Sequence, residues 1–359
     1  MLEYDPAAHS MGRRVRFFGS RLHLGHAPMM EWSPAGFVPC VETPARIDAV
    51  EASFRARGWV VEDVGPAASA ALLQVHSAAY LEFLEHAAAD WSAAGFALPA
   101  VAVNYPHHTV SPSRPPRSIV GRMGYFAFNP GSPILEGTWE AARGAAGVAL
   151  ATADAVRDGA DLAFGLCRPP GHHAGRDYGG GYCYLNNAAL AADWLAARGG
   201  PGSHVAVVDL DYHHGNGTQD LLWERDDITY FSVHADPDFD FPYFTGRRDE
   251  TGAGPGAGFT LNLPLPLGSD DAAWLDAITS GLRQLKHPDV IVVSLGLDTF
   301  IGDERFHVTR AGFREAGRIL AAVAPLVVLL EGGYVVRELG NNAASFVEGA
   351  LGWQAGRSR

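Results

Sequence analysis

The chain has 359 residues, and its 27 lysines and arginines against 40 aspartates and glutamates give a net charge of −13. Apolar residues make up 47% and charged residues 19% of the sequence, which is typical of globular proteins and excludes a disordered chain. The acidic balance argues against nucleic-acid binding, because binding to phosphates requires clustered lysines and arginines. No apolar run approaches the roughly 20 residues of a membrane-spanning helix, so we expect no membrane association.

The N-terminal segment and the cysteines indicate the compartment. Residues 1–16 lack the apolar core of a secretory signal and are expected to form a loose extension, with either Met1 or Met11 as the start. The three scattered cysteines form neither a CxxC pair nor a disulfide framework; they are Cys40, Cys167 and Cys183. These features predict a protein of the reducing cytoplasm.

The first third of the chain has few regular patterns. Apolar residues recur with helical spacing around residues 44–57 and 78–91. A proline-rich stretch without acidic residues follows at residues 98–133, and its length fits a long loop insertion, either functional or a linker. The aromatic residues Tyr125 and Phe128 near its end argue for packing and against a linker.

Beyond Thr138, short apolar runs alternate with alanine-rich helical stretches. The predicted strands cover residues 162–167, 204–210, 228–233, 289–297 and 325–331. The predicted helices cover residues 138–158, 186–198, 271–286, 309–323 and 339–351. Continuous apolar strands separated by helices are typical of a parallel sheet covered on both faces. We therefore predict that residues 1–359 form a single α/β domain with three α/β/α layers.

Ionisable side chains stand at the carboxyl ends of these predicted strands. They are His172 and His173, then Asp209, Asp211, His213 and His214, then His234, Asp236, Asp238 and Asp240, then Asp298, and finally Tyr334. In open α/β sheets, ligands bind at this edge. Any one of these residues alone is more often structural, but their gathering at one edge predicts a catalytic site in the loops that follow the strands.

Three of these residues are suited to holding a metal ion. Asp211 and His213 are two residues apart in an extended segment, so their side chains face the same way. Asp298 offers a third ligand, and three protein ligands leave the open position of a catalytic site. A binuclear manganese hydrolase of the arginase type would need further carboxylates. Since Gly215 stands two residues after His213, the pattern favours one metal.

The remaining candidates are suited to acid–base chemistry. His172 and His173 follow a Pro-Pro-Gly turn, and histidines beside a metal serve as general acid and base near neutral pH. Tyr334 follows two glycines, and its phenol could donate to a developing oxyanion. No GxSxG, HExxH or P-loop motif is present. The glycine-rich stretch 252–257 is followed by a strand-like run, which argues against a dinucleotide site and for a tight loop.

Five ordered motifs resemble the zinc-dependent histone deacetylase family of the arginase/deacetylase superfamily. They are RPPGHHA at 168–174, GGYCYLNNAAL at 180–190, DLDYHHGNGTQ at 209–219, SLGLDTFIGD at 294–303 and EGGY at 331–334. The resemblance extends from residue 39 to about residue 353. Residues 123–142 and the long loop before them resemble bacterial class II-like enzymes and acetylpolyamine amidohydrolases.

The resemblance implies a zinc-dependent hydrolase with an arginase/deacetylase-like fold. The zinc ligands would be Asp211, His213 and Asp298, and the metal would polarise the amide carbonyl. His173 would be the general base and then the acid that protonates the leaving amine. His172, held by Asp209, would assist electrostatically, and Tyr334 would stabilise the oxyanion. The products would be acetate and a free amine, and the sequence leaves open whether the metal in the cell is Zn²⁺ or Fe²⁺.

The resemblance also implies further binding residues. Gly181, Tyr182 and Phe241 would line a narrow acyl-chain tunnel. Arg46 would line an internal channel or form a structural salt bridge. A K⁺ site beneath the zinc ligands would use Asp209, Asp211, His213, Ser232 and Val233, and a second cation site would fall near Leu222, Arg225 and Ile228.

Two features depart from the family pattern. Asn216 stands where many members place an aspartate beside the second histidine, which would leave His173 more readily neutral. Polyamine-cleaving members place an acid in the long loop, whereas this loop carries basic residues, namely Arg114, Arg117 and Arg122. Asp236, Asp238 and Asp240 could instead supply negative charge or form a solvated acidic loop.

The resulting hypothesis is a zinc amidohydrolase that deacetylates a small amine, either an acetylpolyamine or an acetyl-lysine-like amide. A hydrolase of another small amide and a non-catalytic protein that binds acetylated ligands are the alternatives. The arm of residues 17–40 and the long loop resemble segments through which polyamine-type relatives dimerise, which implies a homodimer.

Overall fold

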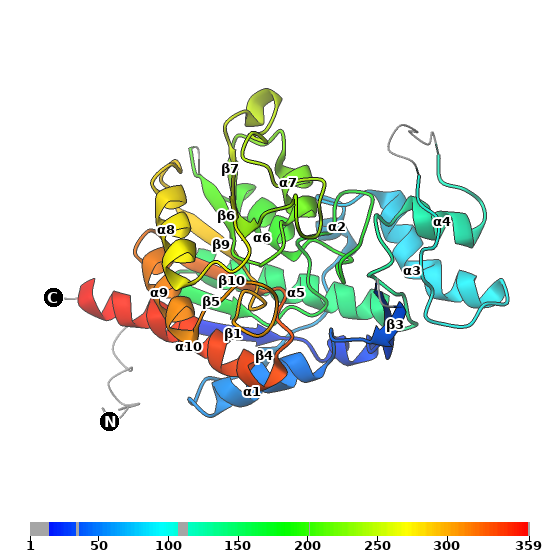
Figure 1. Cartoon of the computed structure of the whole chain (residues 1–359), viewed down its shortest axis with the longest axis horizontal. Helices are drawn as coiled ribbons and strands as arrows, with labels where there is room; N and C mark the ends of the chain where they lie inside the picture. Colours follow the sequence, from blue (N-terminus) through cyan, green and yellow to red (C-terminus); the bar gives the residue numbers. More distant parts are fainter. Residues whose placement is uncertain (1–13, 34–35, 107–113, 201, 358–359) are drawn as a thin grey trace.

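The computed structural model describes residues 14–33, 36–106, 114–200 and 202–357, and it is built on one eight-stranded sheet (Figure 1). The strand order is β4-β1-β5-β10-β9-β6-β7-β8, and all the neighbouring strands run parallel. The strands are β1 (Val15–Gly19), β4 (Val61–Asp63), β5 (Leu162–Gly165), β6 (Val205–Asp209), β7 (Ile228–Ala235), β8 (Thr260–Leu265), β9 (Val290–Leu295) and β10 (Leu326–Leu330). The predicted central parallel sheet is therefore confirmed.

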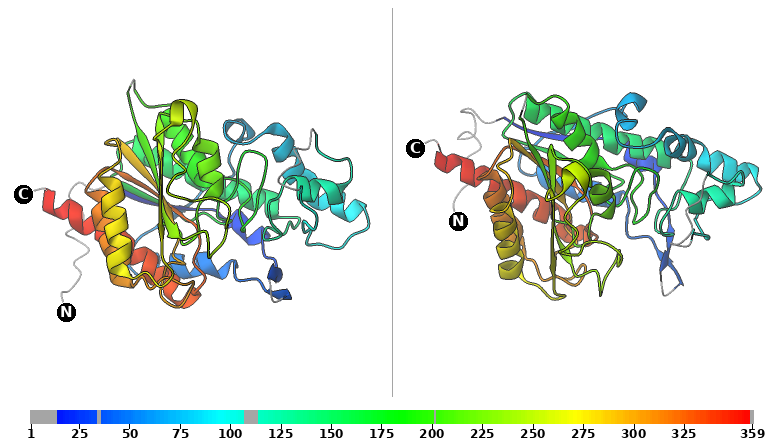
Figure 2. Two further views of the ribbon diagram at one scale, coloured as in Figure 1. Left: turned by 45° about the horizontal axis from the view of Figure 1, so that its top comes forward. Right: turned by 90° about the horizontal axis from the view of Figure 1, so that it is seen from above.

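Helices cover both faces of this sheet (Figure 2). They are α1 (Ala45–Arg55), α2 (Ser69–Leu72), α3 (Ala78–Ala93), α4 (Ile119–Tyr125), α5 (Thr138–Arg157), α6 (Asn187–Ala196), α7 (Asn216–Leu222), α8 (Asp271–Leu282), α9 (Arg310–Ala321) and α10 (Val336–Arg357). Helices α5 and α6 pack on one face, and α1, α8, α9 and α10 pack on the other. Within the described residues, no helix is long and apolar enough to cross a membrane.

The central strands are apolar along their whole length because both of their faces are buried. In β9, Val292 packs with residues of α5 and α6, whereas the next residue, Val293, packs with residues of α1, α8, α9 and α10. Successive side chains of a strand point to opposite faces, so a strand between two helical layers needs apolar residues at every position. This is why the continuous apolar runs in the second half of the sequence predicted these strands correctly.

The N-terminal segment corrects one expectation. Residues 15 and 16 were expected to belong to a loose extension, but they begin β1, which lies between β4 and β5 inside the sheet. Arginines on either side of Val15 hide the apolar pattern of this short strand. Arg16 forms an ion pair with Glu62 of β4 at 2.6 Å, so its charge is carried outside the core. Residues 1–13 of the expected extension, including Met1 and Met11, lie outside the described residues.

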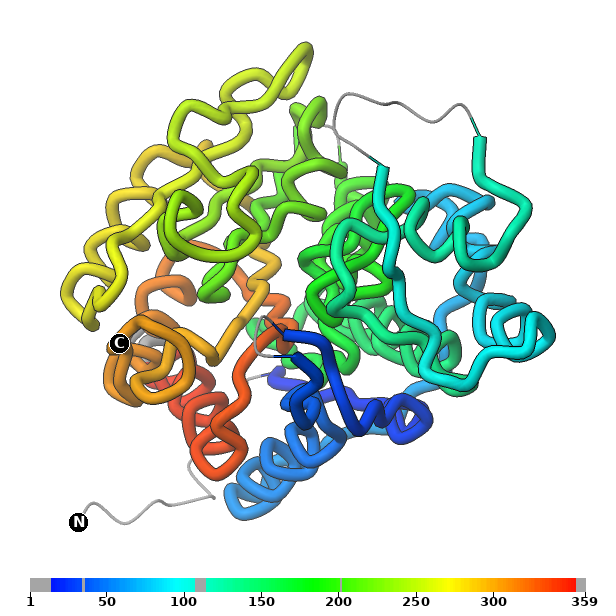
Figure 3. The backbone as a smooth tube through the Cα atoms, turned by 45° about the vertical axis from the view of Figure 1, so that its right-hand side comes forward, coloured from blue at the N-terminus to red at the C-terminus, as the bar shows by residue number. Residues whose placement is uncertain are grey.

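The long segment of residues 98–133 also contains more structure than a loop. Helix α4 forms within it, and Ile119 and Met123, one helical turn apart, are buried in the cluster that includes Phe83 of α3. Figure 3 shows this part of the chain, in cyan, beside the sheet-bearing part. Two prolines before Ser118 end the extended stretch and leave the next residues free to form a helix. Residues 107–113 of the expected loop are not among the described residues.

A small hairpin completes the N-terminal third. Strands β2 (Met30–Ser33) and β3 (Gly36–Pro39) pair antiparallel, outside the main sheet. Together with β1, the hairpin replaces most of the irregular arm that was expected at residues 17–40. The glycine-rich stretch 252–257 forms a tight 3-10 turn before β8, as its turn chemistry predicted.

Candidate active site

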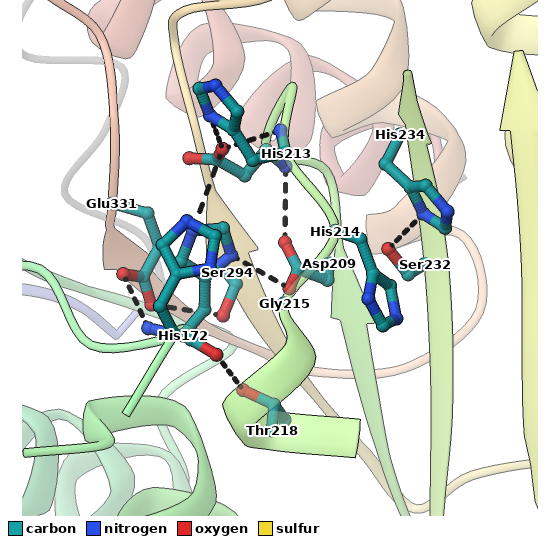
Figure 4. A network of polar contacts seen from close by, with 12 residues as sticks. His172, Asp209, His213, His214, Gly215, Thr218, Ser232, His234, Ser294 and Glu331 are labelled. Atoms are coloured by element: carbon teal, nitrogen blue, oxygen red, sulfur yellow. Dashed lines mark hydrogen bonds and ion pairs between the residues drawn. The ribbon is translucent and has the colours of Figure 1, made fainter. Parts of the chain in front are cut away.

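The carboxyl ends of the parallel strands bring the chemically reactive side chains together. His172 and His173 lie in the loop after β5, Asp211 and His213 in the loop after β6, Asp298 after β9, and Tyr334 after β10. Figure 4 shows His172 between the Glu331 carboxylate on one side and Asp209 on the other. Because parallel strands end at the same edge, residues more than 120 positions apart in the sequence become neighbours here.

Three side chains converge as a metal site would require. Among the described residues, one nitrogen or oxygen from each of Asp211, His213 and Asp298 lies within 4.8 Å of the others. His213 Nδ1 is 3.3 Å from Asp211 Oδ1 and 3.3 Å from Asp298 Oδ2. Asp211 and Asp298 are almost fully buried. Two carboxylates and one imidazole form a donor set suited to a divalent cation.

Backbone amides hold both carboxylates in place. Asp211 Oδ2 accepts from Gly332 N at 2.9 Å, and Asp298 Oδ1 accepts from Tyr212 N at 3.0 Å. A side chain at Gly332 would collide with both carboxylates. Gly332 therefore leaves the space in front of the two carboxylates open. The EGGY motif alone did not reveal this role of its first glycine.

The electrostatics of the two carboxylates fit a cation between them. Asp298 Oδ2 is buried and makes no hydrogen bond within the described residues, and the nearest nitrogen is that of the other proposed ligand His213. Burial and the adjacent Asp211 carboxylate raise the pKa of Asp298 to about 7. Burial would also raise the pKa of Asp211, but nearby His172 and His213 lower it instead. A divalent cation held by this triad would relieve the repulsion between the carboxylates, so the residues present fit a metal ion.

The two adjacent histidines have different partners and opposite pKa shifts. Their ring centroids are 4.0 Å apart, and both side chains are 3% exposed. Although burial disfavours its charged form, the Asp211 and Asp209 carboxylates raise the pKa of His172 to about 10. Burial, together with the positive charges of His172 and His213, lowers the pKa of His173 well below its usual value. The two adjacent imidazoles therefore differ in how readily each holds a second proton, the division of roles that acid–base catalysis uses.

Hydrogen bonds fix the orientation of each ring. His172 Nδ1 lies 3.1 Å from Asp209 Oδ2, and His173 Nδ1 lies 2.7 Å from Asn216 Oδ1. The loop that carries both histidines is held by Glu331, whose carboxylate accepts from Gly171 N at 2.7 Å and from His172 N at 3.2 Å. Burial raises the pKa of Glu331 to about 7. Glu331 was not among the predicted site residues, although it precedes the Gly-Gly-Tyr motif at a strand end.

Tyr334 faces the same space, and its phenol is protonated at neutral pH. Its backbone nitrogen donates to Asp303 Oδ2 at 2.6 Å, which fixes the start of the turn before α10. Burial raises the pKa of Tyr334 above its ordinary value, despite the Arg46 guanidinium 5.0 Å from the ring centroid. Arg46 is fully buried and pairs with Glu42 at 2.8 Å. The predicted salt bridge of Arg46 is thus present, beneath the tyrosine.

Aromatic rings stand on both sides of the site. The Tyr182 ring is 5.7 Å from Tyr334, and the Phe241 ring is 5.0 Å from His173. Phe128 stacks on Phe241, with ring centroids 5.8 Å apart. Phe128 was not predicted as a site residue, although the aromatic residues at the end of the long segment were a signal.

Close packing explains the conformation of the chain beside Tyr182. Gly181 has φ of 53°, and a side chain there would collide with the His173 ring. The backbone of Gly181 therefore lies against the second histidine. Tyr182 itself has φ of 66°, a left-handed conformation that is uncommon and strained for a residue other than glycine.

The charged side chains that the sequence singled out for substrate charge are partly neutralised. Arg122 pairs with Asp90 at 2.6 Å, whereas Arg114 and Arg117 are exposed. Of the three acids in the segment 236–240, Asp238 pairs with Arg247 at 2.7 Å, and Asp240 Oδ2 accepts from Tyr212 Oη at 2.6 Å.

A carboxylate that the sequence reasoning missed lies at Glu31 of the β2–β3 hairpin. Its carboxylate lies near Tyr182 and Cys40, and it raises the pKa of both, while its Oε2 is buried without a hydrogen bond. The short hairpin gave no motif that could have identified it. Cys40, Cys167 and Cys183 are all free and buried.

The residues expected to hold monovalent cations lie beneath the triad and near α7. Asp209 on β6 is paired in register with Ser232 on β7, and Val233 follows it. Ser232 Oγ contacts His234 Nδ1 at 2.8 Å. At the second expected site, Arg225 pairs with Asp193 at 2.9 Å and with Asp227 at 2.7 Å.

Comparison with known proteins places these motifs in a family. The sequence profile of the histone deacetylase domain matches residues 40–350. An acetylpolyamine amidohydrolase of Mycoplana ramosa is 43% identical over 323 residues, which cover 88% of this chain and 93% of that protein. Acetylpolyamine amidohydrolase 2 of Pseudomonas aeruginosa is 39% identical over 341 residues, which cover 92% of this chain and 96% of that protein.

A solved structure shows the same fold. The crystal structure of an acetylpolyamine aminohydrolase from Burkholderia pseudomallei superposes with a TM-score of 0.87 and 36% sequence identity. The match covers 94% of this chain and 99% of that chain. The predicted three-layer fold of the deacetylase type is therefore confirmed.

Proposed function

The chain belongs to the histone deacetylase family, and from this premise we propose that it is a zinc-dependent deacetylase of small acetylated amines, above all acetylpolyamines. The chain is thus an amidohydrolase that acts on linear amides. The observation that carries the proposal is the convergence of Asp211, His213 and Asp298 beside two histidines with opposite pKa shifts. The relatives with 39–43% identity are named acetylpolyamine amidohydrolases, which supports the substrate class.

Asp211, His213 and Asp298 would hold the zinc ion. A zinc ion bound there supplies Lewis-acid polarisation of the amide carbonyl and lowers the pKa of water. The support for this ligand set is the buried Oδ2 of Asp298, which makes no hydrogen bond within the described residues, and the space that Gly332 leaves in front of the two carboxylates.

The remaining polar groups would move and stabilise charge. His173 is neutral and buried, so its free nitrogen would take a proton from the attacking water and return it to the leaving amine. His172, charged between Asp209 and Asp211, would stabilise the negative charge that develops nearby. Tyr334 keeps its proton and would donate a hydrogen bond to the oxyanion.

The aromatic pair Tyr182 and Phe241 would enclose the methylene chain of the substrate, with the Gly181 backbone beside it. Burial of apolar chain between such rings contributes about 0.8 kcal/mol per methylene group. A cationic amine would then meet the negative charge of Glu31, which adjoins Tyr182. This carboxylate would supply the negative charge that the basic residues of the long segment cannot supply.

Three further proposals complete the function. A K⁺ ion would bind through Asp209, the main chain of Asp211 and His213, and the carbonyls of Ser232 and Val233, where it would offset the buried carboxylates. We expect a homodimer, in which the long segment and the hairpin of each copy narrow the entrance. Free, buried cysteines support the cytoplasm as the compartment.

The deciding experiment compares kcat/KM of the zinc-loaded enzyme on acetylputrescine and on an acetyl-lysine peptide, with metal stoichiometry measured in parallel. A preference for acetylputrescine and one zinc ion per chain would support the proposal. A preference for the peptide would contradict the polyamine assignment and leave the chemistry intact. Two metal ions per chain, or binding of both ligands without turnover, would contradict the mechanism itself. Light scattering on the same sample tests the dimer.

A further inference from the structure

Two buried histidines take no part in the proposed mechanism. His214 follows the proposed ligand His213, and His234 lies on β7 (Figure 4). Their rings are fully buried, and the ring centroids are 4.7 Å apart. Buried polar groups need hydrogen-bond partners, so the contacts of these two rings indicate what they hold in place.

Both rings contact the connection between β7 and β8. His214 Nδ1 lies 3.0 Å from Thr245 Oγ1. His234 Nε2 lies 2.9 Å from the carbonyl oxygen of the next residue, Gly246. A side chain at Gly246 would collide with both rings, and its φ of 106° also favours glycine. The main chain at Gly246 therefore lies directly against the two histidines.

A carboxylate and an amide fix the same glycine from α7 and β8. Glu250 Oε2 accepts from Gly246 N at 2.8 Å and from Gln219 Nε2 at 2.6 Å. The oxygen of the Gln219 amide accepts from Asn262 Nδ2 at 2.6 Å and lies 3.1 Å from His214 Nε2. Gln219 and Asn262 are both buried. The side chain of Gln219 therefore joins a helix, a strand and the connection between β7 and β8 in one hydrogen-bond network.

Phe241, five residues before Gly246, forms a wall of the active site. Its ring centroid is 5.0 Å from that of His173. Phe241 N donates to Asp240 Oδ1 at 2.9 Å, and Asp240 Oδ2 accepts from Tyr212 Oη at 2.6 Å. The segment 241–245 is thus fastened at both ends. A chain this short cannot shift at Gly246 without moving Phe241.

We propose that His214, Gln219 and Glu250 are positioning residues that fix Gly246 and thereby set the place of the Phe241 ring against the substrate chain. The inference rests on the proposed function, in which Phe241 encloses the methylene chain of an acetylated amine. The network reaches the site through the main chain of the segment 241–245. It therefore acts on binding of the chain and not on cleavage of the amide bond.

Glu250 offers two variants that are expected to fold, because it borders an open cavity of about 450 Å³ and its truncation leaves no void in the core. Glu250→Ala removes the acceptor of both hydrogen bonds. Glu250→Gln loses the charge but keeps an oxygen that accepts from Gly246 N and Gln219 Nε2. Asp271→Ala is a matched control, because Asp271 also accepts from a backbone amide, that of Thr309 at 2.7 Å, outside this network.

The kinetic test is a double-mutant cycle with Phe241→Ala on the zinc-loaded enzyme, with acetylputrescine as substrate. Glu250→Ala should raise KM about fivefold and change kcat less than about twofold, because the lost hydrogen bonds place a ring that binds only the chain. In the Phe241→Ala background, the same change should raise KM less than about twofold, because the ring is gone. Glu250→Gln and Asp271→Ala should keep the KM of the wild type.

Three kinetic outcomes would overturn the proposal. An equal rise in KM in both backgrounds would mean that Glu250 does not act through Phe241. An unchanged KM in Glu250→Ala would mean that the network does not position the ring. A rise in KM in Glu250→Gln equal to that in Glu250→Ala would mean that the charge of Glu250 attracts the amine directly.

Hydrogen–deuterium exchange tests the positioning without turnover. In Glu250→Ala, peptides that cover residues 241–250 should exchange faster than in the wild type, because Gly246 N loses its acceptor. Peptides that cover Gly332, whose amide donates to Asp211, should exchange at the wild-type rate. Unchanged exchange at residues 241–250 would overturn the inference. If exchange rises there but the wild-type enzyme cleaves no acetylated amine, the positioning stands and the proposed function fails.

Discussion

The floor and the rim of this site are built in different ways. We call the floor the buried group at the strand ends, consisting of His172, Asp209, Asp211, Asp298 and Glu331, all 3% exposed or less. The rim consists of the β2–β3 hairpin and the segment 239–244. Its aromatic side chains are largely open to solvent, with Trp32 52%, Phe37 64%, Phe239 66% and Phe244 84% exposed.

The difference shows which part of the function the fold holds rigid. The floor carboxylates accept hydrogen bonds from backbone amides, as Asp211 does from Gly332 and Glu331 does from Gly171. Moving such a group requires moving the main chain of the sheet. The exposed aromatic side chains of the rim have no comparable restraint from backbone amides. We therefore expect changes in the floor to abolish chemistry and changes in the rim to alter substrate preference.

The largest effect is expected for Asp298→Ala. The variant loses one of three ligands, so it should lose the metal. Its turnover should fall by more than the 10²–10³-fold that one oxyanion donor typically contributes. Metal content after dialysis measures the loss. Asp236→Ala, just before the rim segment, is the matched control and should retain one metal per chain. Full metal content in Asp298→Ala would remove Asp298 from the ligand set.

A slightly smaller loss is expected for His173→Ala. Removing a general base costs on the order of 10²- to 10⁴-fold in kcat, and the metal should stay bound because His173 is not a ligand. Steady-state kinetics and metal analysis on the same preparation measure both quantities. Replacement of the exposed His307 by alanine should change neither. Near-wild-type turnover in His173→Ala would contradict the assigned mechanism.

The free energy of unfolding should also fall at acidic pH, because a neutral histidine holds the loop that carries the floor residue His172. His76 Nδ1 lies 2.8 Å from the Gly175 carbonyl, and His76 Nε2 accepts from Asn186 N at 3.0 Å, so a neutral ring holds the catalytic loop. Burial lowers the pKa of His76 to about 4. The unfolded chain takes up this proton near pH 6.5 and the folded chain only near pH 4, so stability is lost as the pH falls through this window.

This loss amounts to about 3 kcal/mol for the single histidine. Chemical denaturation at several pH values between 7 and 4 measures it. His76→Gln should be less stable at pH 7 and should show a shallower decline toward acid. A decline as steep as that of the wild type would show that other groups cause the acid sensitivity.

The smallest effect is expected at the rim. Glu31→Gln removes a negative charge beside Tyr182, and it should raise KM for acetylputrescine several-fold, in line with the 0.2–1 kcal/mol of partly solvated ion pairs. It should leave kcat, and KM for a neutral acetanilide, unchanged. An equal rise in KM for the neutral acetanilide would show that Glu31 supports the structure of the entrance and does not recognise the amine.

The fold was predictable from the sequence in its regular, fully buried strands and less predictable in the irregular N-terminal third. The predicted strands β5, β6, β7, β9 and β10 have both faces buried. Such strands are recognisable from apolar runs alone. Strand β1 escaped because Arg16 interrupts its short pattern, and its place depends on an ion pair with Glu62 of a strand far along the chain. Helix α4 was missed because its apolar residues need α3 to pack against.

The candidate site divides in a similar way. The ligand triad and the two histidines are predictable because they stand at strand ends in local motifs, and parallel strands end together. Glu331, Phe128 and Glu31 were not predicted, since each acts through a neighbour distant in the sequence.

The sequence by itself determined the fold class, the reaction type and the residues expected to carry it, because strand pattern and ligand spacing are local properties of the chain. The tertiary structure alone decided the opposite pKa shifts of His172 and His173, which are adjacent in the sequence and nearly equally buried. His172 meets two carboxylates, whereas His173 meets an amide and the ring of His172. The free energy of a buried charge depends on such neighbours, and only folding brings them within a few ångströms.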